Sequence, residues 1–149
     1  MMKIVFLCTA NSCRSQMAEG FARQLGAGAV EAWSAGIIAA GVNENAAAVM
    51  REAGVDISAQ RSKTIDEIPM DEMDLVVTLC DNAARFCPDA PAGGRKLHVP
   101  VKDPVGATGA PEDVLNDFRR AREEIRAIVS GILDGIAAAP PPSGKASIH

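Results

Sequence analysis

The stretch "KIVFLCTANSCRSQMAEG", residues 3–20, joins an apolar run to a helical pattern through a loop of small and polar residues. Residues 3–7 form a short, mostly apolar run with β-branched side chains, as in a buried strand. Beyond the loop, Met17, Phe21 and Leu25 recur every four positions. This spacing predicts a helix from residue 16 with one apolar face, ended by the glycines within residues 26–28. The chain therefore opens with a strand, a tight loop and a helix.

The same alternation continues through the rest of the sequence. Further strands are predicted at residues 30–36 and 74–80, with a weaker one at 96–101, and further helices at 43–53 and 111–138. Strands that alternate with helices favour a parallel sheet covered by helices on both faces. The sequence thus predicts a single α/β domain over residues 1–138 with a four-stranded parallel sheet. The proline-rich residues 139–149 are predicted to be a disordered tail.

Composition excludes several classes of function. The chain has 149 residues, 48% of them hydrophobic, and a net charge of −4, which gives it no basic field for a nucleic-acid partner. No segment approaches the roughly eighteen apolar residues of a membrane span, and the first residues lack the apolar core of an export signal. We expect a cytoplasmic protein that binds no membrane. In that compartment its four cysteines are candidates for catalytic, redox or metal-binding roles.

The loop after the first strand is a candidate oxyanion site. Such a loop, curling into a helix N-terminus, points several backbone amides inward, and the helix dipole adds to their field. The arginine that ends it supplies a planar fork for two oxygens, and the same field favours a thiolate at Cys8, to which Ser15 can donate a hydrogen bond. The alternative is that Cys8 is a buried apolar residue and the arginine a surface charge. The predicted oxyanion-binding residues are Thr9, Ala10, Asn11, Ser12, Cys13 and Arg14.

Cys80 and Cys87 form a second candidate pair. Six residues separate them, more than the two to four usual between zinc ligands, so a metal role is the weaker alternative. If the segment between them is helical, their Cα atoms lie about 10 Å apart at about 1.5 Å per residue. A disulfide tolerates at most about 7 Å. A redox role therefore requires this segment to unravel, and its composition makes it only a marginal helix.

Four stretches together resemble the thioredoxin-coupled arsenate reductases, relatives of the low-molecular-weight tyrosine phosphatases. They are "CTANSCRSQMAEG" (8–20), "WSAG" (33–36), "DLVVTLCDNAARFCP" (74–88) and "DP" (103–104). The resemblance covers roughly residues 3–135 and implies a flavodoxin-like fold, with four parallel strands flanked by helices on both faces.

The resemblance also implies a mechanism. Cys8 attacks arsenate, and Asp103 protonates the departing oxygen as general acid. Cys80 then attacks Cys8, arsenite leaves, and Cys87 attacks Cys80, so that thioredoxin reduces a final Cys80–Cys87 disulfide. We expect a monomer without a bound cofactor or metal. For Asp103 the alternative is an ordinary turn aspartate, and Cys13, which has no step in this scheme, is interpreted as a packing residue.

One position departs from the family pattern. Many relatives have an aspartate where this chain has Lys63, and there it joins positions equivalent to Asn11, Glu19 and Ser34 in binding potassium. We expect the Lys63 ammonium to replace the potassium ion and support the loop, which predicts activity insensitive to potassium. A solvated surface lysine is the alternative.

Three alternatives remain open. A phosphotyrosine phosphatase would share Cys8, Arg14 and Asp103, but the chain has no tyrosine and no aromatic residue directly after the Asp–Pro turn to hold a substrate ring. Weak hydrolysis of small aryl phosphates is still expected, because the loop stabilises any tetrahedral oxyanion. A non-enzymatic redox or metal sensor would use the cysteines without needing Arg14, and an enzyme coupled to a small thiol would not need Cys87.

Overall fold

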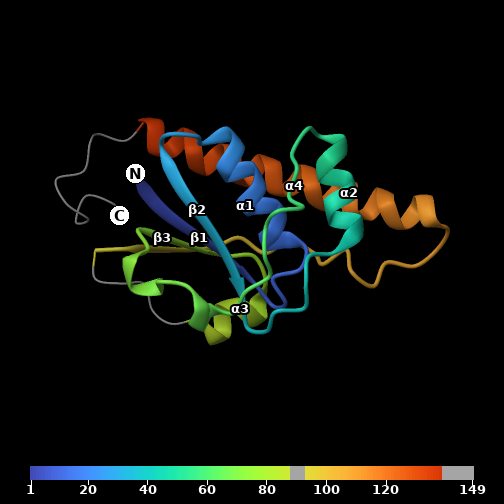
Figure 1. Ribbon diagram of the computed structural model, residues 1–149, viewed down its shortest axis with the longest axis horizontal. Coiled ribbons are helices and arrows are strands. Elements are labelled where there is room, and N and C mark those ends of the chain that lie inside the picture. The colour runs from blue at the N-terminus through green and yellow to red at the C-terminus, as the bar shows by residue number, and fades with distance from the viewer. Residues whose placement is uncertain (88–92, 139–149) are drawn as a thin grey trace.

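The computed structural model describes residues 1–87 and 93–138, so the predicted tail lies outside the described residues. The strands are β1 (Met2–Cys8), β2 (Val30–Gly36), β3 (Leu75–Thr78) and β4 (Arg95–His98). They form one parallel sheet in the order β2-β1-β3-β4 (Figure 1). The α-helices are α1 (Arg14–Leu25), α2 (Glu44–Glu52), α3 (Asp81–Phe86) and α4 (Pro111–Ala138). The predicted fold, a flavodoxin-like α/β domain with a four-stranded parallel sheet, is confirmed.

The two faces of the sheet are covered by different elements because strand side chains alternate between the faces. Ile4 and Phe6 of β1 point into a large apolar core that also includes residues of α1, α2 and α4. Val5 and Leu7 point into a smaller core on the other face, beneath α3 and two 3-10 turns, η1 (Ile65–Glu67) and η2 (Met70–Glu72). Figure 1 shows this layering, with α1, α2 and α4 on one side and α3 on the other.

The helices begin where the sequence supplies suitable caps. The Asn43 side chain accepts hydrogen bonds from the backbone N–H groups of Asn45 and Ala46 at the start of α2. α4 begins with Pro111, which a first turn accepts because its missing N–H would have no partner there. Phe118 and Ile125 of α4 are buried in the core that α4 shares with α1 and α2. Within the described residues, no helix is long and apolar enough to cross a membrane.

Three predicted boundaries are wrong by a few residues. β3 ends at Thr78 rather than at Cys80, because the chain turns there to start α3, with Cys80 as its N-cap. The strand predicted at 96–101 begins at Arg95 and ends at His98, before Pro100, which has no N–H to continue the ladder. α1 begins at Arg14, two residues earlier than its apolar pattern indicates.

Candidate active site

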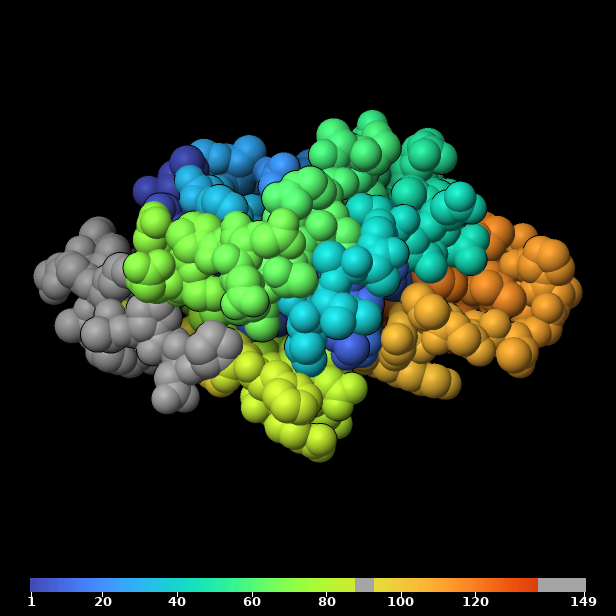
Figure 2. Space-filling model, turned by 60° about the horizontal axis from the view of Figure 1, so that its bottom comes forward, coloured from blue at the N-terminus to red at the C-terminus, as the bar shows by residue number. Residues whose placement is uncertain are grey.

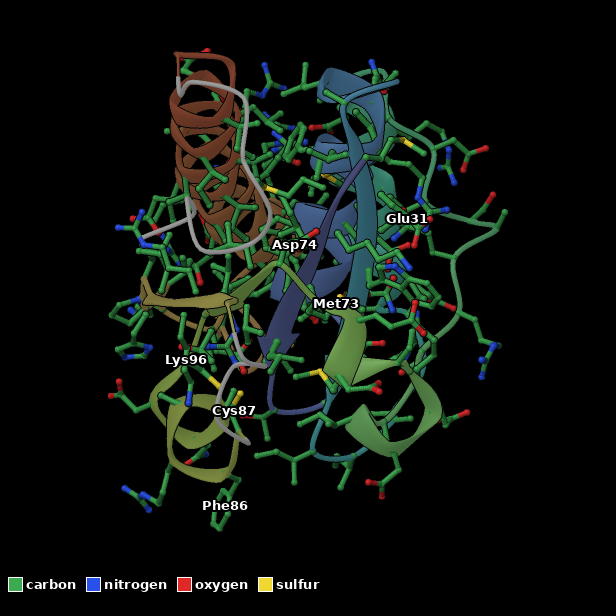
Figure 3. All side chains as sticks on the ribbon, turned by 90° about the vertical axis from the view of Figure 1, so that its left-hand side faces the viewer. Glu31, Met73, Asp74, Phe86, Cys87 and Lys96 are labelled. Carbon is green, nitrogen blue, oxygen red and sulfur yellow. The ribbon has the colours of Figure 1, made fainter. Side chains whose placement is uncertain are left out.

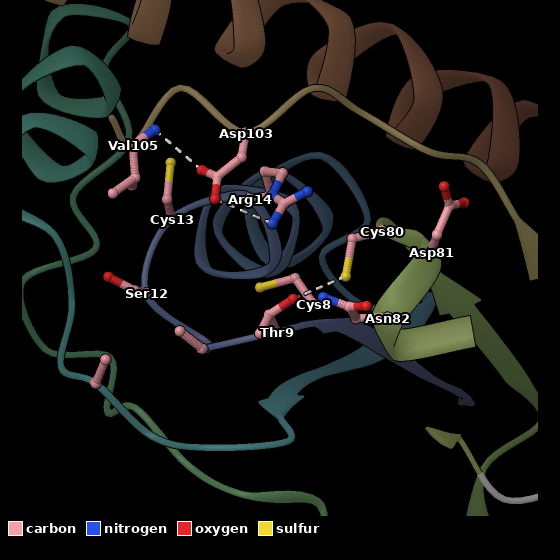
Figure 4. A pocket seen from close by; sticks show the side chains of 12 residues that line it. Cys8, Thr9, Ser12, Cys13, Arg14, Cys80, Asp81, Asn82, Asp103 and Val105 are labelled. Carbon is pink, nitrogen blue, oxygen red and sulfur yellow. Dashed lines mark hydrogen bonds and ion pairs between the residues drawn. The ribbon is translucent and has the colours of Figure 1, made fainter. Parts of the chain in front are cut away.

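An open pocket of about 610 Å³ lies where β1 and β3 end. Its walls are the β1–α1 loop, the start of α3, the segment that carries Asp103 and Val105, and Ala40 (Figure 4). In Figure 2 the β1–α1 loop, in blue, is visible from outside, framed by the cyan, orange and yellow-green segments that supply the other walls. This position at the carboxyl ends of the strands is the one that open α/β sheets use for ligands.

The β1–α1 loop has its carbonyl groups turned away from the pocket. The carbonyl oxygens of residues 9–12 accept hydrogen bonds at 2.8–3.1 Å from the surrounding chain, from Ile37, Ile38, Ala40, Asn43 and Ser62. In a trans peptide the N–H group points opposite to the preceding C=O group. The amides of residues 10–13 are therefore directed toward the pocket, which Ala10, Ser12 and Cys13 line, and this is the arrangement of an anion-binding nest.

Two residues allow the loop to take this shape. Asn11 has a φ of 45°, a left-handed conformation that asparagine tolerates better than most residues. At Gly36, where β2 ends, a Cβ atom would stand 2.6 Å from the Asn11 nitrogen and 2.5 Å from the Ile38 carbonyl oxygen. Only glycine lets the sheet approach the loop this closely.

Cys8 is 3% exposed and lies at the floor of the pocket, at the end of β1. Its sulfur lies 2.8 Å from the hydroxyl oxygen of Ser15. That hydroxyl oxygen already accepts a hydrogen bond of 2.8 Å from the Asn11 side-chain amide. The Ser15 proton is therefore free to point at the sulfur, where it stabilises negative charge. Asn11, Ser15 and Cys8 thus form a chain of hydrogen bonds that ends on the candidate nucleophile.

Arg14 and Asp103 face each other across the pocket. Arg14 is 7% exposed, and its guanidinium donates to the Val101 carbonyl oxygen at 3.0 Å. A second guanidinium nitrogen lies 3.4 Å from the Asp103 carboxylate, which also accepts a hydrogen bond from the Val105 N–H at 2.9 Å (Figure 4). The guanidinium is therefore held at the pocket with a carboxylate beside it, suited to bind an anion and to deliver a proton to it.

Cys80 connects the pocket to α3. Its sulfur lies 3.2 Å from the Thr9 hydroxyl oxygen and accepts a hydrogen bond from the Ala83 N–H at 3.3 Å, which caps α3. α3 has only six residues and ends directly before Cys87, which is partly buried. All four cysteines are in the free thiol form. The structure thus brings Cys8 and Cys80 to one pocket and places Cys87 at the far end of a short helix.

A buried polar cluster supports the loop from behind. The Ser34 hydroxyl donates to the Glu19 carboxylate at 2.6 Å, and the Lys63 ammonium lies 3.7 Å from the same carboxylate. The Lys63 backbone N–H donates to the Asn11 side-chain oxygen at 2.8 Å. Burial lowers the pKa of Lys63, and the Glu19 charge opposes that effect. The cluster therefore ties a lysine charge to the asparagine that shapes the loop.

Cys13 belongs to the loop but differs from the other cysteines in its environment. It is 3% exposed and contacts the large apolar core, and it precedes the first residue of α1. Burial raises the pKa of the Cys13 thiol, and the nearby Asp103 charge raises it further. The thiol is therefore protonated at neutral pH, as suits a packing residue.

Sequence reasoning missed a group of residues that support the loop. The Gln16 side-chain amide donates to the backbone and side-chain oxygens of Asn11, at 3.1 and 3.0 Å. Gln60 in turn donates to the Gln16 side chain at 2.8 Å, and Ser62 to the Asn11 carbonyl oxygen at 2.9 Å. One sequence signal was available, because Gln16 directly precedes Met17 of the apolar helix face. In the structure Gln16 is fully buried, and a buried glutamine has a specific hydrogen-bonding role.

The chain matches the family of low molecular weight phosphotyrosine protein phosphatases over residues 3–139. An arsenate reductase from Halalkalibacterium halodurans is 49% identical over 122 residues, 82% of this chain and 88% of that protein. A solved arsenate reductase in the phosphate binding state has a TM-score of 0.79 and 36% identity, and covers 91% of this chain and 99% of its own. Another, in the oxidized state, has a TM-score of 0.78 and 34% identity with the same coverage. Together with the loop geometry, these similarities place this chain in the low molecular weight phosphotyrosine protein phosphatase family, close to its arsenate reductases.

Proposed function

We propose that this chain reduces arsenate to arsenite, with Cys8 as nucleophile and Cys80 and Cys87 as a thiol relay that thioredoxin regenerates. The observation that carries the proposal is the position of Cys80. Its sulfur lies in the wall of the pocket that contains Cys8, and it starts the short helix that ends before Cys87. A phosphatase, which hydrolyses its substrate, needs neither of these two thiols. The similarity to arsenate reductases over most of the chain supports the same conclusion.

In the first step the loop binds arsenate as a tetrahedral oxyanion. The amides of residues 10–13 and the Arg14 guanidinium bind its oxygens, in keeping with the phosphate binding state of a solved relative. The Cys8 thiolate, with the Ser15 hydroxyl directed at it, attacks arsenic and forms a sulfur–arsenic bond. Asp103 protonates the oxygen that departs as water.

In the second step two electrons pass from sulfur to arsenic. The Cys80 thiolate attacks the Cys8 sulfur, the sulfur–arsenic bond breaks, and its electron pair stays on arsenic, which leaves as arsenite. The Cys87 thiolate then attacks the Cys80 sulfur and releases Cys8 as a thiolate. The resulting Cys80–Cys87 disulfide requires α3 to open, because the six helical residues between the cysteines keep the two Cα atoms about 10 Å apart. A dithiol reductant restores both thiols.

The experiment that tests this proposal is a steady-state assay with arsenate, thioredoxin, thioredoxin reductase and NADPH. We expect arsenate-dependent NADPH oxidation that is abolished in Cys8→Ser and strongly reduced in Arg14→Ala. A wild-type protein that produces no arsenite under these conditions would rule out the proposed activity.

Cys87→Ser separates the relay from simpler schemes. We expect this variant to stop after a single turnover with arsenate and to accumulate a Cys8–Cys80 disulfide, which mass spectrometry of the unreduced protein identifies. Sustained turnover of Cys87→Ser with thioredoxin as the sole reductant would contradict the relay.

Phosphatase activity is a second candidate, which family membership and the Arg14–Asp103 pair favour. The residues that line the pocket, all within the described chain, include no aromatic side chain to hold a phosphotyrosine ring. We therefore propose that hydrolysis is a weak side activity, limited to small phosphate esters. Parallel assays with p-nitrophenyl phosphate and arsenate test this, and efficient hydrolysis without arsenate reduction would reverse the assignment.

We also propose that Lys63 takes the place of the potassium ion that the resemblance implies. The oxygens that would coordinate such an ion already have donors: Ser34 and Lys63 approach Glu19, and the Lys63 and Gln16 N–H groups donate to the Asn11 side-chain oxygen. The donor set therefore does not suit an additional cation, and the ammonium supplies the positive charge from within the chain.

A further inference from the structure

The surface next to Cys87 carries an unusually exposed aromatic ring. Phe86, the last residue of α3, is 63% exposed, whereas the other three phenylalanines of the chain are at most 2% exposed. In Figure 3 its ring projects away from the body of the molecule. A ring this exposed buries little apolar area in the monomer, and its position directly before a redox cysteine makes it available to a partner that approaches that cysteine.

Two cations accompany this ring. Arg85 precedes it on α3, and both Arg85 and Lys96 of β4 are exposed. Lys96 pairs with Val76 of β3, whose side chain belongs to the core beneath α3, so Lys96 emerges on the α3 side of the sheet (Figure 3). Among residues 1–87 and 93–138, neither cation takes part in an ion pair.

The acidic residue of α3 is engaged elsewhere. The Asp81 carboxylate lies 2.9 Å from the His98 ring nitrogen Nε2, at the start of the helix. The chain as a whole carries a net charge of −4. An exposed ring preceded by Arg85, with Lys96 on the same side of the sheet as Cys87, is thus a local exception to the charge of the molecule, and it favours a partner with carboxylates around an apolar contact.

We propose that Arg85, Phe86, Cys87 and Lys96, here called the exit surface, form the docking site for the protein dithiol that reduces the Cys80–Cys87 disulfide. This inference rests on the proposed function. Phe86 would enter the apolar surroundings of the partner's reactive cysteine, and the two cations would face carboxylates at the rim of that region. Aromatic residues at the centre of an interface with charged residues at its rim match the usual anatomy of protein contacts.

The chemistry of reduction requires contact at this place. A thiolate of the partner attacks the Cys87 sulfur, Cys80 leaves as a thiolate, and a mixed disulfide joins the two proteins. The partner's second thiol then attacks its own bonded sulfur and releases Cys87, so that two electrons enter this chain and the partner becomes the disulfide. Cys87 is partly exposed and Cys80 is only 8% exposed, so Cys87 is the accessible target. A partner that reaches its sulfur meets the end of α3 that carries Phe86.

The test compares Phe86→Ser with Leu25→Ser, a matched control at the end of α1 that is 52% exposed in the wild type. For Phe86→Ser we expect the KM for thioredoxin to rise by about tenfold, the usual scale for losing an aromatic anchor. The rate at which dithiothreitol reduces the Cys80–Cys87 disulfide should stay unchanged, as should arsenite formation by the pre-reduced protein in a single turnover. Leu25→Ser should match the wild type in all three measurements.

Two further variants test the same docking site in case Phe86→Ser perturbs folding. Phe86→Leu retains an apolar contact and should raise the KM less than Phe86→Ser. Lys96→Glu should lower kcat/KM for thioredoxin at low ionic strength, with the difference from wild type shrinking as salt is added.

The outcomes distinguish the two proposals. If Phe86→Ser and Lys96→Glu reduce arsenate normally in a single turnover and keep the wild-type KM for thioredoxin, docking at the exit surface is wrong and the proposed function stands. If the pre-reduced wild-type protein forms no arsenite, both proposals fall together.

Discussion

A few specific contacts at Asn11 and Gly36 determine the shape of the anion-binding loop. Asn11 adopts a left-handed conformation, and three groups hold it there: the Lys63 N–H, the Gln16 side chain and the Ser15 hydroxyl. On the other side, Gly36 supplies only a hydrogen atom where any side chain would meet the loop backbone. The loop is therefore preformed, and its amides need no rearrangement to receive an oxyanion.

Substitution of Gly36 tests this preformed shape. In Gly36→Ala the new methyl group would displace the Asn11 backbone, and overpacking of this kind costs about 1–3 kcal/mol. We expect kcat/KM for arsenate to fall by at least about tenfold, since about 1.4 kcal/mol of lost transition-state stabilisation has that effect. Gly131→Ala on α4, where a Cβ meets nothing within 4 Å, is the control and should stabilise the helix by about 1 kcal/mol. Wild-type activity in Gly36→Ala would show that the loop accommodates the methyl group, and would contradict the claim that its exact shape is needed.

Lys63 allows a test of the charge behind the loop. If its ammonium replaces a bound ion, arsenate turnover should be the same in potassium and in an inert cation such as tetramethylammonium. Lys63→Met removes the charge and leaves Glu19 without that partner, so we expect kcat/KM to fall several-fold. A marked loss of wild-type efficiency on removing potassium would contradict the assignment.

Residues of the site were foreseen within the first loop and, as for Cys80, Cys87 and Asp103, in separate stretches that carry the family resemblance. The loop from Cys8 to Arg14 was recognised because it lies between a strand and a helix, and Ser15 because it follows directly. Gln60 and Ser62 were missed, because they reach the loop from a segment that has no regular structure and no periodic pattern. A long-range contact of this kind depends on the fold of the whole chain.

Among the elements, α3 combines a structural role with one that requires it to open. The Cys80 sulfur caps its first turn, and the Cys87 N–H donates to the Ala83 carbonyl oxygen at its end, at 2.9 Å. A helix of six residues is marginal in isolation, so local opening costs far less than global unfolding. Cys80 and Cys87, which close the two ends of α3 in the reduced state, would bond to each other through their sulfurs once it opens.

Ala84→Gly should make this opening easier. Glycine in a helix interior costs about 1 kcal/mol relative to alanine, so the open form should become up to about fivefold more populated. We expect the Cys80–Cys87 disulfide to form faster by a similar factor in quenched-flow alkylation experiments with arsenate. Ala127→Gly, at an exposed position of α4, is the control and should leave that rate unchanged. A slower rate in Ala84→Gly would indicate that the intact helix is needed for the transfer.

Element boundaries show where sequence patterns stop being informative. The long helix α4 was predicted with its full length because its apolar stripe repeats over many turns. β3 was predicted too long because Leu79 and Cys80 are as apolar as the strand before them, and only the turn into α3 ends it. The 3-10 turns η1 and η2 were not predicted, since three-residue elements have no period to detect.

At the scale of the whole molecule, a surface ion-pair cluster joins α2 to α4. Glu52 of α2 accepts hydrogen bonds from Arg119 at 2.9 and 2.7 Å and from Arg122 at 2.9 Å. The hydrogen bond from Arg119 is the main reason why the pKa of Glu52 is lowered to about 2 from an ordinary value of 4.5. The carboxylate is therefore held ionised in the folded chain.

This shift makes stability depend on pH with a definite sign. A carboxyl group whose pKa is lower in the folded state than in the unfolded state stabilises the fold above its unfolded value, and this contribution disappears as the pH falls. The free energy of unfolding, measured with urea, should include the whole Glu52 contribution above about pH 5. That contribution should decrease as the pH falls from 4.5 to 2. Glu52→Gln should flatten the profile in that window. Superimposable profiles of Glu52→Gln and wild type would refute the assigned role.

The architecture as a whole was accessible from sequence. The alternation of strands and helices predicts a parallel α/β sheet, and the order β2-β1-β3-β4 has β1 and β3, the two most continuously apolar strands, at its centre. How the loops meet around the pocket was not predictable in this way, because their contacts follow from the finished sheet.

The most direct test of the account uses the full-length protein, fully reduced and freed of reductant, mixed with excess arsenate. We predict one equivalent of arsenite per chain, a fall from four free thiols to two, and a disulfide between Cys80 and Cys87 in peptide maps. Arsenite formation without thiol loss, or complete retention of all four thiols in the presence of arsenate, would contradict the claim that Cys8 starts a relay ending at Cys87.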